Sequence, residues 1–339
     1  MAREASYQAK VWTELDTPEL REWLRGIPAS DLAVNPFPTR TDIPRGGVQL
    51  WCRCEMLVME WMLHRPQEVV AHQLHHAMPR MLLRVSARGG NSGAKEFRQR
   101  CHRFLTGCYS DLWDCDLPPR TPPYVRGSEE RKLDRATRLA KAGHLHRAVK
   151  VASSSPMPPL GPHLTGVLRG MYPVPEVESD PAPTMDGARC ITVTAELVET
   201  IVSGLPRVAS ADIAGRRNEH YQTLLKHGFA SILARYAEVF HNVELSDTVC
   251  QWLNIARGVA PAKPGTEGAA EEDIALRPIS VPIILYSISA KAGLIQHTEK
   301  HLHTGAQTAA SFFTAHGQYG VGVPHGTELV THTVQFVAD

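Results

Sequence analysis

The stretch Gly258–Pro282, GVAPAKPGTEGAAEEDIALRPISVP, decides how this chain is interpreted. Two short apolar arms flank a polar, acidic connector that contains glycine, and this pattern predicts a β-hairpin. Lys263 and Arg277 lie near the inner ends of the two arms. Two neighbouring cations suit a polyanion such as a triphosphate or a nucleic-acid backbone, although a solvated surface hairpin has the same pattern.

The charge of the chain is unevenly distributed. Its 339 residues leave room for two or three domains, and the net charge of +1 does not by itself indicate a polyanionic partner. Residues 80–150, however, contain 16 Lys or Arg against seven Asp or Glu, a net charge of +9. This basic middle is a candidate nucleic-acid footprint, and a solvated helical face is the competing explanation.

The cysteines and the apolar runs bear on the compartment. Seven cysteines, an odd number, occur without a CxxC pair, so a reducing compartment is expected. The N-terminus MAREASYQAK lacks the apolar region of a secretory signal. No apolar run approaches the roughly 18 residues of a membrane helix. The expectation is a soluble, intracellular protein, nuclear or cytoplasmic, with no membrane partner.

Apolar residues at helical spacing predict a mostly α-helical chain with one small β-hairpin, an α+β fold. Thr17, Thr194 and Ser246 are expected to cap helices. Three histidines at helical spacing, His72, His75 and His76, are expected at the surface or in the core, with no metal. The longer helices are expected at 50–63, 95–113, 129–151, 216–242 and 282–303. The chain is divided into a helical N-terminal region with a basic C-terminal part (1–117), a basic helix with a Pro/Ser-rich extended linker (118–189), and a third region (190–339).

Several motifs occur in an order that is typical of one family. Leu205-Pro206-Arg207, with Gly215 and the Asn218-Glu219-His220 run, resembles the loop and helix that open the reverse-transcriptase domain of non-LTR retrotransposons. Residues 256–264 and 276–281 resemble the first strands of its fingers, and 318–328, QYGVGVPHGTE, resembles the segment between fingers and palm. Residues 141–148 resemble the basic helix that precedes such domains. The resemblance extends over 80–339 and is closest to site-specific elements of the spliced-leader-associated type.

The resemblance implies a helical N-terminal extension followed by the fingers portion of a reverse-transcriptase fold in 190–339. It implies that Lys263 and Arg277 bind the triphosphate of an incoming nucleotide. It implies an RNA template and a DNA primer or target as partners. The template would contact Gln318, Gly320 and Gly322, and the nucleic-acid backbone would contact Arg98, Arg100, Arg103, Arg131, Lys132 and Arg135.

The chain also departs from the family. Residues 210–215, SADIAG, replace a Gly-Pro-Asp-Gly-like turn, and the acidic insert at 266–275 is longer than usual. The complete family enzyme needs Mg²⁺ held by palm aspartates, but this chain has no Asp-Asp pair and stops at Asp339. We therefore expect the N-terminal and fingers portion of an RNA-directed DNA polymerase, truncated before the palm, with no catalytic or metal-binding residues and inactive alone. The alternatives are a nucleic-acid-binding remnant of a decayed retroelement and a helical interaction protein.

Overall fold

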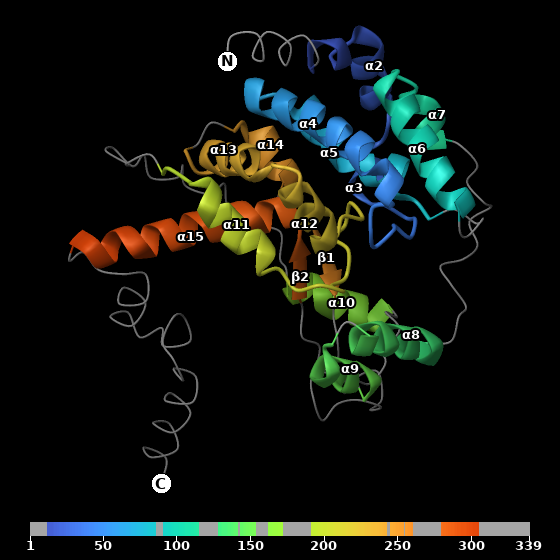
Figure 1. Cartoon of the computed structure of the whole chain (residues 1–339), viewed down its shortest axis with the longest axis vertical. Coiled ribbons are helices and arrows are strands. Elements are labelled where there is room, and N and C mark those ends of the chain that lie inside the picture. The colour runs from blue at the N-terminus through green and yellow to red at the C-terminus, as the bar shows by residue number, and fades with distance from the viewer. Residues whose placement is uncertain are drawn as a thin grey trace.

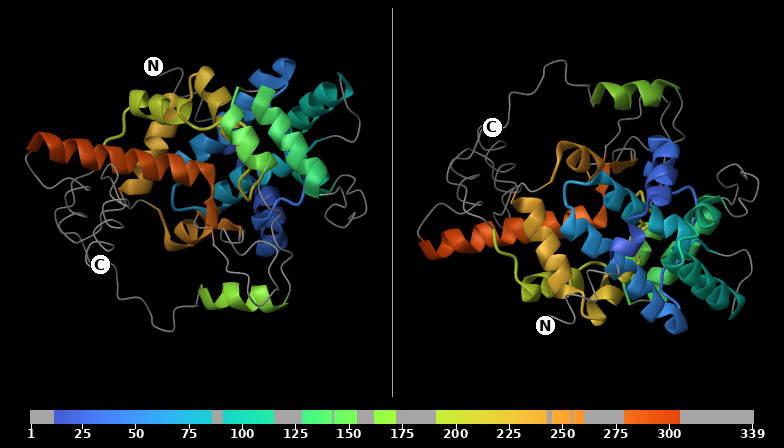
Figure 2. Two further views of the ribbon diagram at one scale, coloured as in Figure 1. Left: turned by 90° about the horizontal axis from the view of Figure 1, so that it is seen from below. Right: turned by 90° about the horizontal axis from the view of Figure 1, so that it is seen from above.

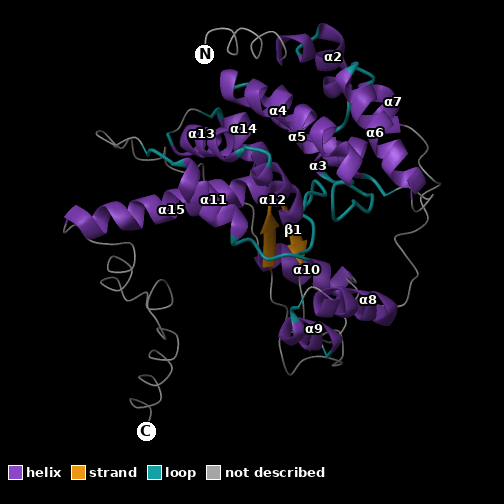
Figure 3. Ribbon diagram, viewed as in Figure 1, coloured by secondary structure: helices purple, strands orange, loops and turns teal. Residues whose placement is uncertain are grey.

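The structure is a computed structural model that describes residues 12–85, 91–114, 128–141, 143–153, 162–171, 191–242, 245–253, 255–259 and 279–304. Helices make up most of this part of the chain, and one pair of short strands forms its sheet (Figures 1 and 3). The expectation of a mostly helical fold with a small β-hairpin is confirmed at this coarse level.

The elements follow one another in two groups. The first group is α2 (Pro18–Gly26), α3 (Ala29–Ala33), the 3₁₀ turn η1 (Arg45–Gly47), α4 (Val48–His64), α5 (Val69–Met78), the π-helical turn η2 (Pro79–Leu83), α6 (Asn91–Leu105), α7 (Tyr109–Asp114), α8 (Ser128–Lys141) and α9 (Leu145–Ala152). The second group is α10 (Pro162–Met171), α11 (Ala195–Ser203), α12 (Asn218–Lys226), α13 (Ala230–His241), α14 (Asp247–Leu253), β1 (Ala256–Val259), β2 (Ile279–Pro282) and α15 (Ile284–Thr304).

The three predicted helix caps are confirmed. The Thr17 hydroxyl accepts a hydrogen bond from the Leu20 backbone N–H at 3.2 Å, and Pro18 occupies the first helical position of α2. Thr194 caps α11 in the same way, at 3.2 Å. Ser246 caps α14 at 3.4 Å. Each hydroxyl satisfies one of the amide donors that a helix start leaves without an intrahelical partner.

Three predicted long helices are each broken into two. The expected helix 216–242 is divided into α12 and α13 at Gly228, whose φ is +85°. In the same way Gly107 separates α6 from α7, and Gly143 separates α8 from α9, both with a φ of +82°. Glycine adopts this left-handed conformation without the steric cost that a Cβ adds, so each break bends the chain sharply. The continuous helices predicted for 95–113, 129–151 and 216–242 were therefore wrong at these glycines.

The predicted linker is also partly helical. Residues 162–171 form α10, so an extended geometry is wrong for this part of 153–187. Helix α10 carries Leu164, whose side chain is buried. Its sequence, PHLTGVLRGM, has proline at the first helical position, where a missing N–H costs nothing.

Strands β1 and β2 pair in antiparallel register, as the hairpin pattern predicted. Ala256 is opposite Pro282, and Val259 is opposite Ile279. Residues 260–278 therefore leave and re-enter the sheet at neighbouring positions. Helix α15 begins directly after β2 and continues as a long helix that extends past the other elements at its carboxyl end (Figures 1 and 2).

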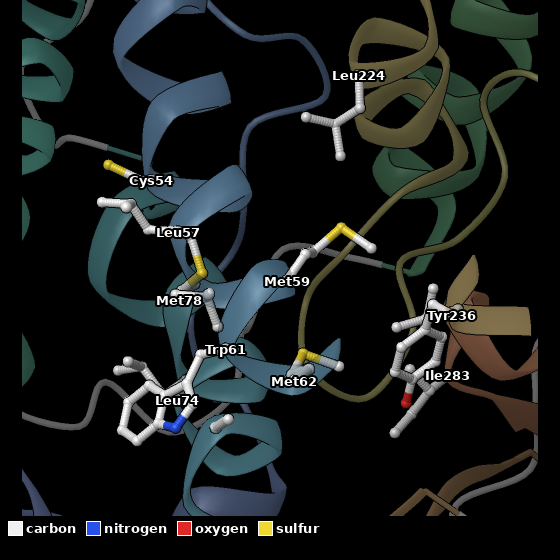
Figure 4. Close-up of a cluster of buried hydrophobic side chains, with 14 of the residues drawn as sticks. Cys54, Leu57, Met59, Trp61, Met62, Leu74, Met78, Leu224, Tyr236 and Ile283 are labelled. Atoms are coloured by element: carbon white, nitrogen blue, oxygen red, sulfur yellow. The ribbon is translucent and has the colours of Figure 1, made fainter. Parts of the chain in front are cut away.

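One hydrophobic core joins the first and third sequence regions. Buried side chains from Trp12 to Trp113 and from Val193 to Ala292 belong to the same cluster. Figure 4 shows part of it, with Met59 and Met62 of α4 on the side that faces Leu224 and Tyr236. The three sequence ranges stay a prediction, but the packing shows that residues before 115 and after 190 depend on each other for burial.

Helices α8 and α9 form a helical hairpin outside that core. Their buried side chains, Ala136, Leu139 and Ala148, do not belong to the main cluster of the described residues. Among the described elements, α8 packs chiefly against α9 (Figure 1). Leu133, Leu145 and Val149, expected on the apolar side, are instead 65 to 67% exposed.

Candidate functional site

The residues predicted to bind nucleotide and template lie outside the described part of the chain. These residues are Lys263, Arg277, Gln318, Gly320 and Gly322. The helices expected near 308–313 and after 327 lie outside it too. What the structure describes of this site is its base, the paired strands β1 and β2 on either side of residues 260–278.

The three arginines of α6 lie in different environments. Arg98 is exposed. Arg100 is buried, and its guanidinium donates to the Arg84 carbonyl at 2.7 Å and to Glu96. Arg103 is partly exposed and pairs with Asp111 across the bend at Gly107, at 2.5 Å. The buried guanidinium of Arg100 is thus used inside the protein, while Arg98 presents its charge to solvent.

The helical hairpin α8–α9 gathers most of the remaining predicted contacts. Residues 128–152 hold seven Lys or Arg against three Asp or Glu. Lys132 is half-buried and Arg135 is exposed, as are Arg138 and Lys141 further along α8; Arg131 belongs to the same helix. The exposed side chains of Leu133, Leu145 and Val149 lie on the same two helices. This surface can therefore offer cations and apolar groups to one ligand.

The predicted family turn at 210–215 is replaced by a compact turn around a buried aspartate. The Asp212 carboxylate accepts hydrogen bonds from the backbone N–H of Arg216 at 2.8 Å and of Ile284 at 3.1 Å. Gly215 has a φ of +94°, and a Cβ added there would lie 2.4 Å from Asn35 Nδ2. This turn requires glycine for both its conformation and its packing.

A buried ion pair connects that turn to the first sequence region. Arg216 Nη1 is 2.6 Å from Glu55 Oε1, and both side chains are almost wholly excluded from solvent. The same guanidinium donates to the His75 carbonyl at 2.8 Å, and its carbon lies 5.7 Å from the Trp51 ring centre. Such a pair is costly to desolvate, so it is stable only while both charges and their hydrogen bonds remain.

The charges around Arg216 determine the protonation of its neighbours. Burial favours the protonated Glu55 carboxyl, but Arg216 and His75 outweigh it and lower the pKa of Glu55. Burial lowers the pKa of His75, and Arg216 lowers it further against the effect of Glu55. Burial raises the pKa of Asp212, although its backbone donors oppose the shift. The network therefore holds an ionised Glu55 beside a neutral imidazole at neutral pH.

The histidines of α5 are core residues, one of the two environments expected from the sequence. His72, His75 and His76 are at most 5% exposed. Burial lowers the pKa of His72 to about 3 and that of His76 to about 4. The Tyr236 hydroxyl lies 3.3 Å from His72 Nδ1, and the Ala33 carbonyl lies 2.9 Å from His76 Nε2. These rings thus link α5 to other elements by hydrogen bonds.

Sequence reasoning missed the Arg216–Glu55 network. The available signal was Glu55 within the apolar run 54–63, CEMLVMEWML. A carboxylate surrounded by core residues needs a buried partner. The identity of that partner was not readable, because 161 residues separate Glu55 from Arg216.

Metal and membrane features were also examined in the described part. In these ranges no three His, Cys, Asp or Glu side chains converge in a way that could hold a metal ion. Every helix there is too short or too polar to span a bilayer. The chain matches no protein-family model, no curated protein and no solved structure.

Proposed function

We propose that this chain binds nucleic acid through the helical hairpin α8–α9. The observation that carries the proposal is a basic helix pair outside the main core, with exposed Arg135, Arg138 and Lys141 beside exposed apolar side chains. Cations on such a surface contact phosphates and release counterions. Neighbouring Leu and Val side chains contact sugars and bases, which a solvated face would not require.

We further propose that the chain is the N-terminal and fingers portion of an RNA-directed DNA polymerase of the non-LTR retrotransposon kind. The antiparallel pairing of β1 with β2, followed at once by α15, supports this reading because it matches the order of elements that the resemblance implies. Lys263 and Arg277 then bind the nucleotide triphosphate from residues 260–278.

The residues present do not fit the Mg²⁺ site of a complete polymerase. Two-metal catalysis needs clustered carboxylates. The chain has no Asp-Asp pair, and within the described ranges no carboxylates and histidines converge on a metal position. No catalytic step is therefore assigned to this chain, and primer extension by the isolated protein is expected to give no product. Robust DNA synthesis would contradict this part of the proposal.

The test of nucleic-acid binding uses the full chain and a fluorescently labelled single-stranded RNA. Anisotropy is measured between about 50 and 200 mM salt. The variant Arg135→Glu/Arg138→Glu/Lys141→Glu is compared with Arg25→Glu/Lys226→Glu/Lys291→Glu, which makes the same charge change at exposed positions on other helices. We expect the α8 variant to lose binding and to reduce the salt slope by about two, at roughly 0.7 per phosphate contact.

The control variant decides between a local surface and a general charge effect. If both variants weaken binding equally, the assignment to α8–α9 is wrong. If the wild-type chain gives no signal at low salt, the nucleic-acid proposal fails and the helical interaction protein is favoured.

A second experiment separates the polymerase portion from a nucleic-acid-binding remnant of a decayed retroelement. A photoreactive deoxynucleotide triphosphate is crosslinked to the chain, and the labelled peptide is identified by mass spectrometry. We expect labelling within 260–278 that Lys263→Ala and Arg277→Ala reduce. RNA binding without such labelling supports the remnant.

A further inference from the structure

A pocket opens between the N-terminal helices and the α6–α7 bend, away from the helical hairpin α8–α9. Its volume is about 390 Å³, within the usual range for small-molecule sites. Leu20 and Trp23 of α2, Leu57 of α4 and Leu105 and Tyr109 beside Gly107 are among the residues that line it. A pocket with this lining favours a ligand with an apolar body.

The aromatic wall of the pocket is pre-arranged. The Trp23 and Tyr109 rings stack at 6.0 Å between centroids with an interplanar angle of 23°. Tyr109 also contacts Phe104 edge-on at 5.2 Å, which fixes the orientation of its ring. The faces of Trp and Tyr rings carry negative electrostatic potential and attract cations.

Tyr109 has a further feature that indicates a ligand. Its side chain lines the pocket and is only 6% exposed, yet within the described ranges its hydroxyl makes no hydrogen bond. Burial raises the pKa of Tyr109, so the hydroxyl stays neutral and available as donor or acceptor. A buried phenol without a partner is the kind of group that a bound molecule satisfies.

The charges at the pocket rim have a net negative sign. Glu14 and Glu19 line it, and within the described part neither carboxylate makes an ion pair. Arg53 supplies the single opposing charge. Two carboxylates against one guanidinium favour a positively charged ligand over a neutral or anionic one.

We propose that this pocket binds a small organic ammonium ion with an apolar or aromatic body. The body packs between the leucines and the Trp23–Tyr109 pair, and the ammonium group lies toward Glu14 and Glu19. The Tyr109 hydroxyl accepts a hydrogen bond from the ligand. This site does not depend on the proposed nucleic-acid function.

The test uses three probes with the same phenyl body: 2-phenylethylammonium, 2-phenylethanol and phenylacetate. Binding to the full chain is measured by isothermal titration calorimetry and by ligand-observed NMR. We expect the ammonium to bind most tightly and phenylacetate least. Trp23→Leu removes the cation–π contact and should weaken binding of the ammonium about threefold or more.

Charge variants at the rim test the sign of the site. Glu14→Gln and Glu19→Gln should each weaken ammonium binding about two- to fivefold, as expected for a partly solvated charge contact. Arg53→Gln should strengthen it by a similar factor. Circular dichroism confirms that each variant keeps the wild-type helix content, so that a loss of binding is not a loss of fold.

Three results would overturn the proposal. Equal binding of all three probes means that the pocket recognises only the phenyl body. No binding of 2-phenylethylammonium, while the variants and the wild type remain folded, means that the pocket is not an ammonium site. Tighter binding of zwitterionic phenylalanine, lost in Arg53→Gln, assigns the pocket to an amino-acid-like ligand instead.

Discussion

Replacing Arg216 by methionine should destabilise the fold strongly because it leaves a buried charge alone. Met keeps much of the volume of the side chain but removes the partner of Glu55, which is 0% exposed. It also removes the donor to the His75 carbonyl. Breaking one side of a buried pair costs about 3–5 kcal/mol, a large part of the roughly 5–15 kcal/mol that stabilises a typical domain.

The double variant provides the internal control. Glu55→Met/Arg216→Met removes both charges, so no buried ion is left to desolvate. What remains is the His75 carbonyl without its donor, a loss of about 1 kcal/mol. The double variant should therefore be more stable than either single variant, with a coupling free energy of about 2 kcal/mol or more.

Urea unfolding at pH 7, followed by circular dichroism at the helix band, measures these free energies. In Arg216→Met the Glu55 carboxyl loses the cation that lowered its pKa, so desolvation raises that pKa. Glu55 then contributes less destabilisation as the pH falls and the carboxyl is protonated. If each single variant costs under about 1 kcal/mol, or if the double variant costs the sum of the two, the buried pair does not act as described.

Three further changes test other parts of the fold. The unfolded chain takes up protons below about pH 6.5 at histidines that the folded chain keeps neutral, so the urea midpoint should fall from pH 6.5 to 5, by about 2 kcal/mol for each such histidine. The pKa values are about 3, 4 and 3 for His72, His76 and His220, with burial as the main cause; a flat profile would contradict it. Gly215→Ala should cost about 2 kcal/mol or more in urea unfolding, because the φ is +94° and Asn35 and Thr39 block a Cβ, whereas Gly26→Ala has open space and should be harmless. Val208 has a φ of 58° although it is β-branched, so Val208→Asn should raise the melting temperature through a gain of about 1 kcal/mol, and an unchanged melting temperature would argue against strain there.

Local sequence rules were enough for much of the secondary structure. Thr17, Thr194 and Ser246 could be recognised as caps because the chemistry of a helix start lies within three residues. The pairing of β1 with β2 followed from two apolar arms around a glycine-containing connector. Helix α15 followed from an uninterrupted apolar run after Pro282.

The helix breaks were missed because periodicity continues across them. Apolar spacing on either side of Gly228 fits one helix, and only its φ of +85° shows that α12 and α13 diverge. Sequence alone does not distinguish a tolerated glycine inside a helix from one that ends it. The three dividing glycines therefore carried more structural information than the pattern around them.

Of the candidate site, the sequence could identify the basic character of α8 but not which cations point outward. Arg100 and Arg98 are two residues apart on α6, yet one is buried against Glu96 and the other is exposed. Exposure depends on elements that pack from elsewhere in the chain, such as the Arg84 carbonyl that accepts from Arg100. The pocket beside Trp23 was not foreseen for the same reason.

The shared core also has a consequence for synthesis of the protein on the ribosome. Glu55 leaves the exit tunnel 161 residues before Arg216, and His72 precedes Tyr236 by 164. At about 5–20 residues per second, the apolar faces of α4 and α5 wait roughly 8–30 s for the helices that cover them. The nascent chain is thus a natural client for a chaperone that shields apolar helices, and slower production at low temperature with added chaperone should increase the soluble yield.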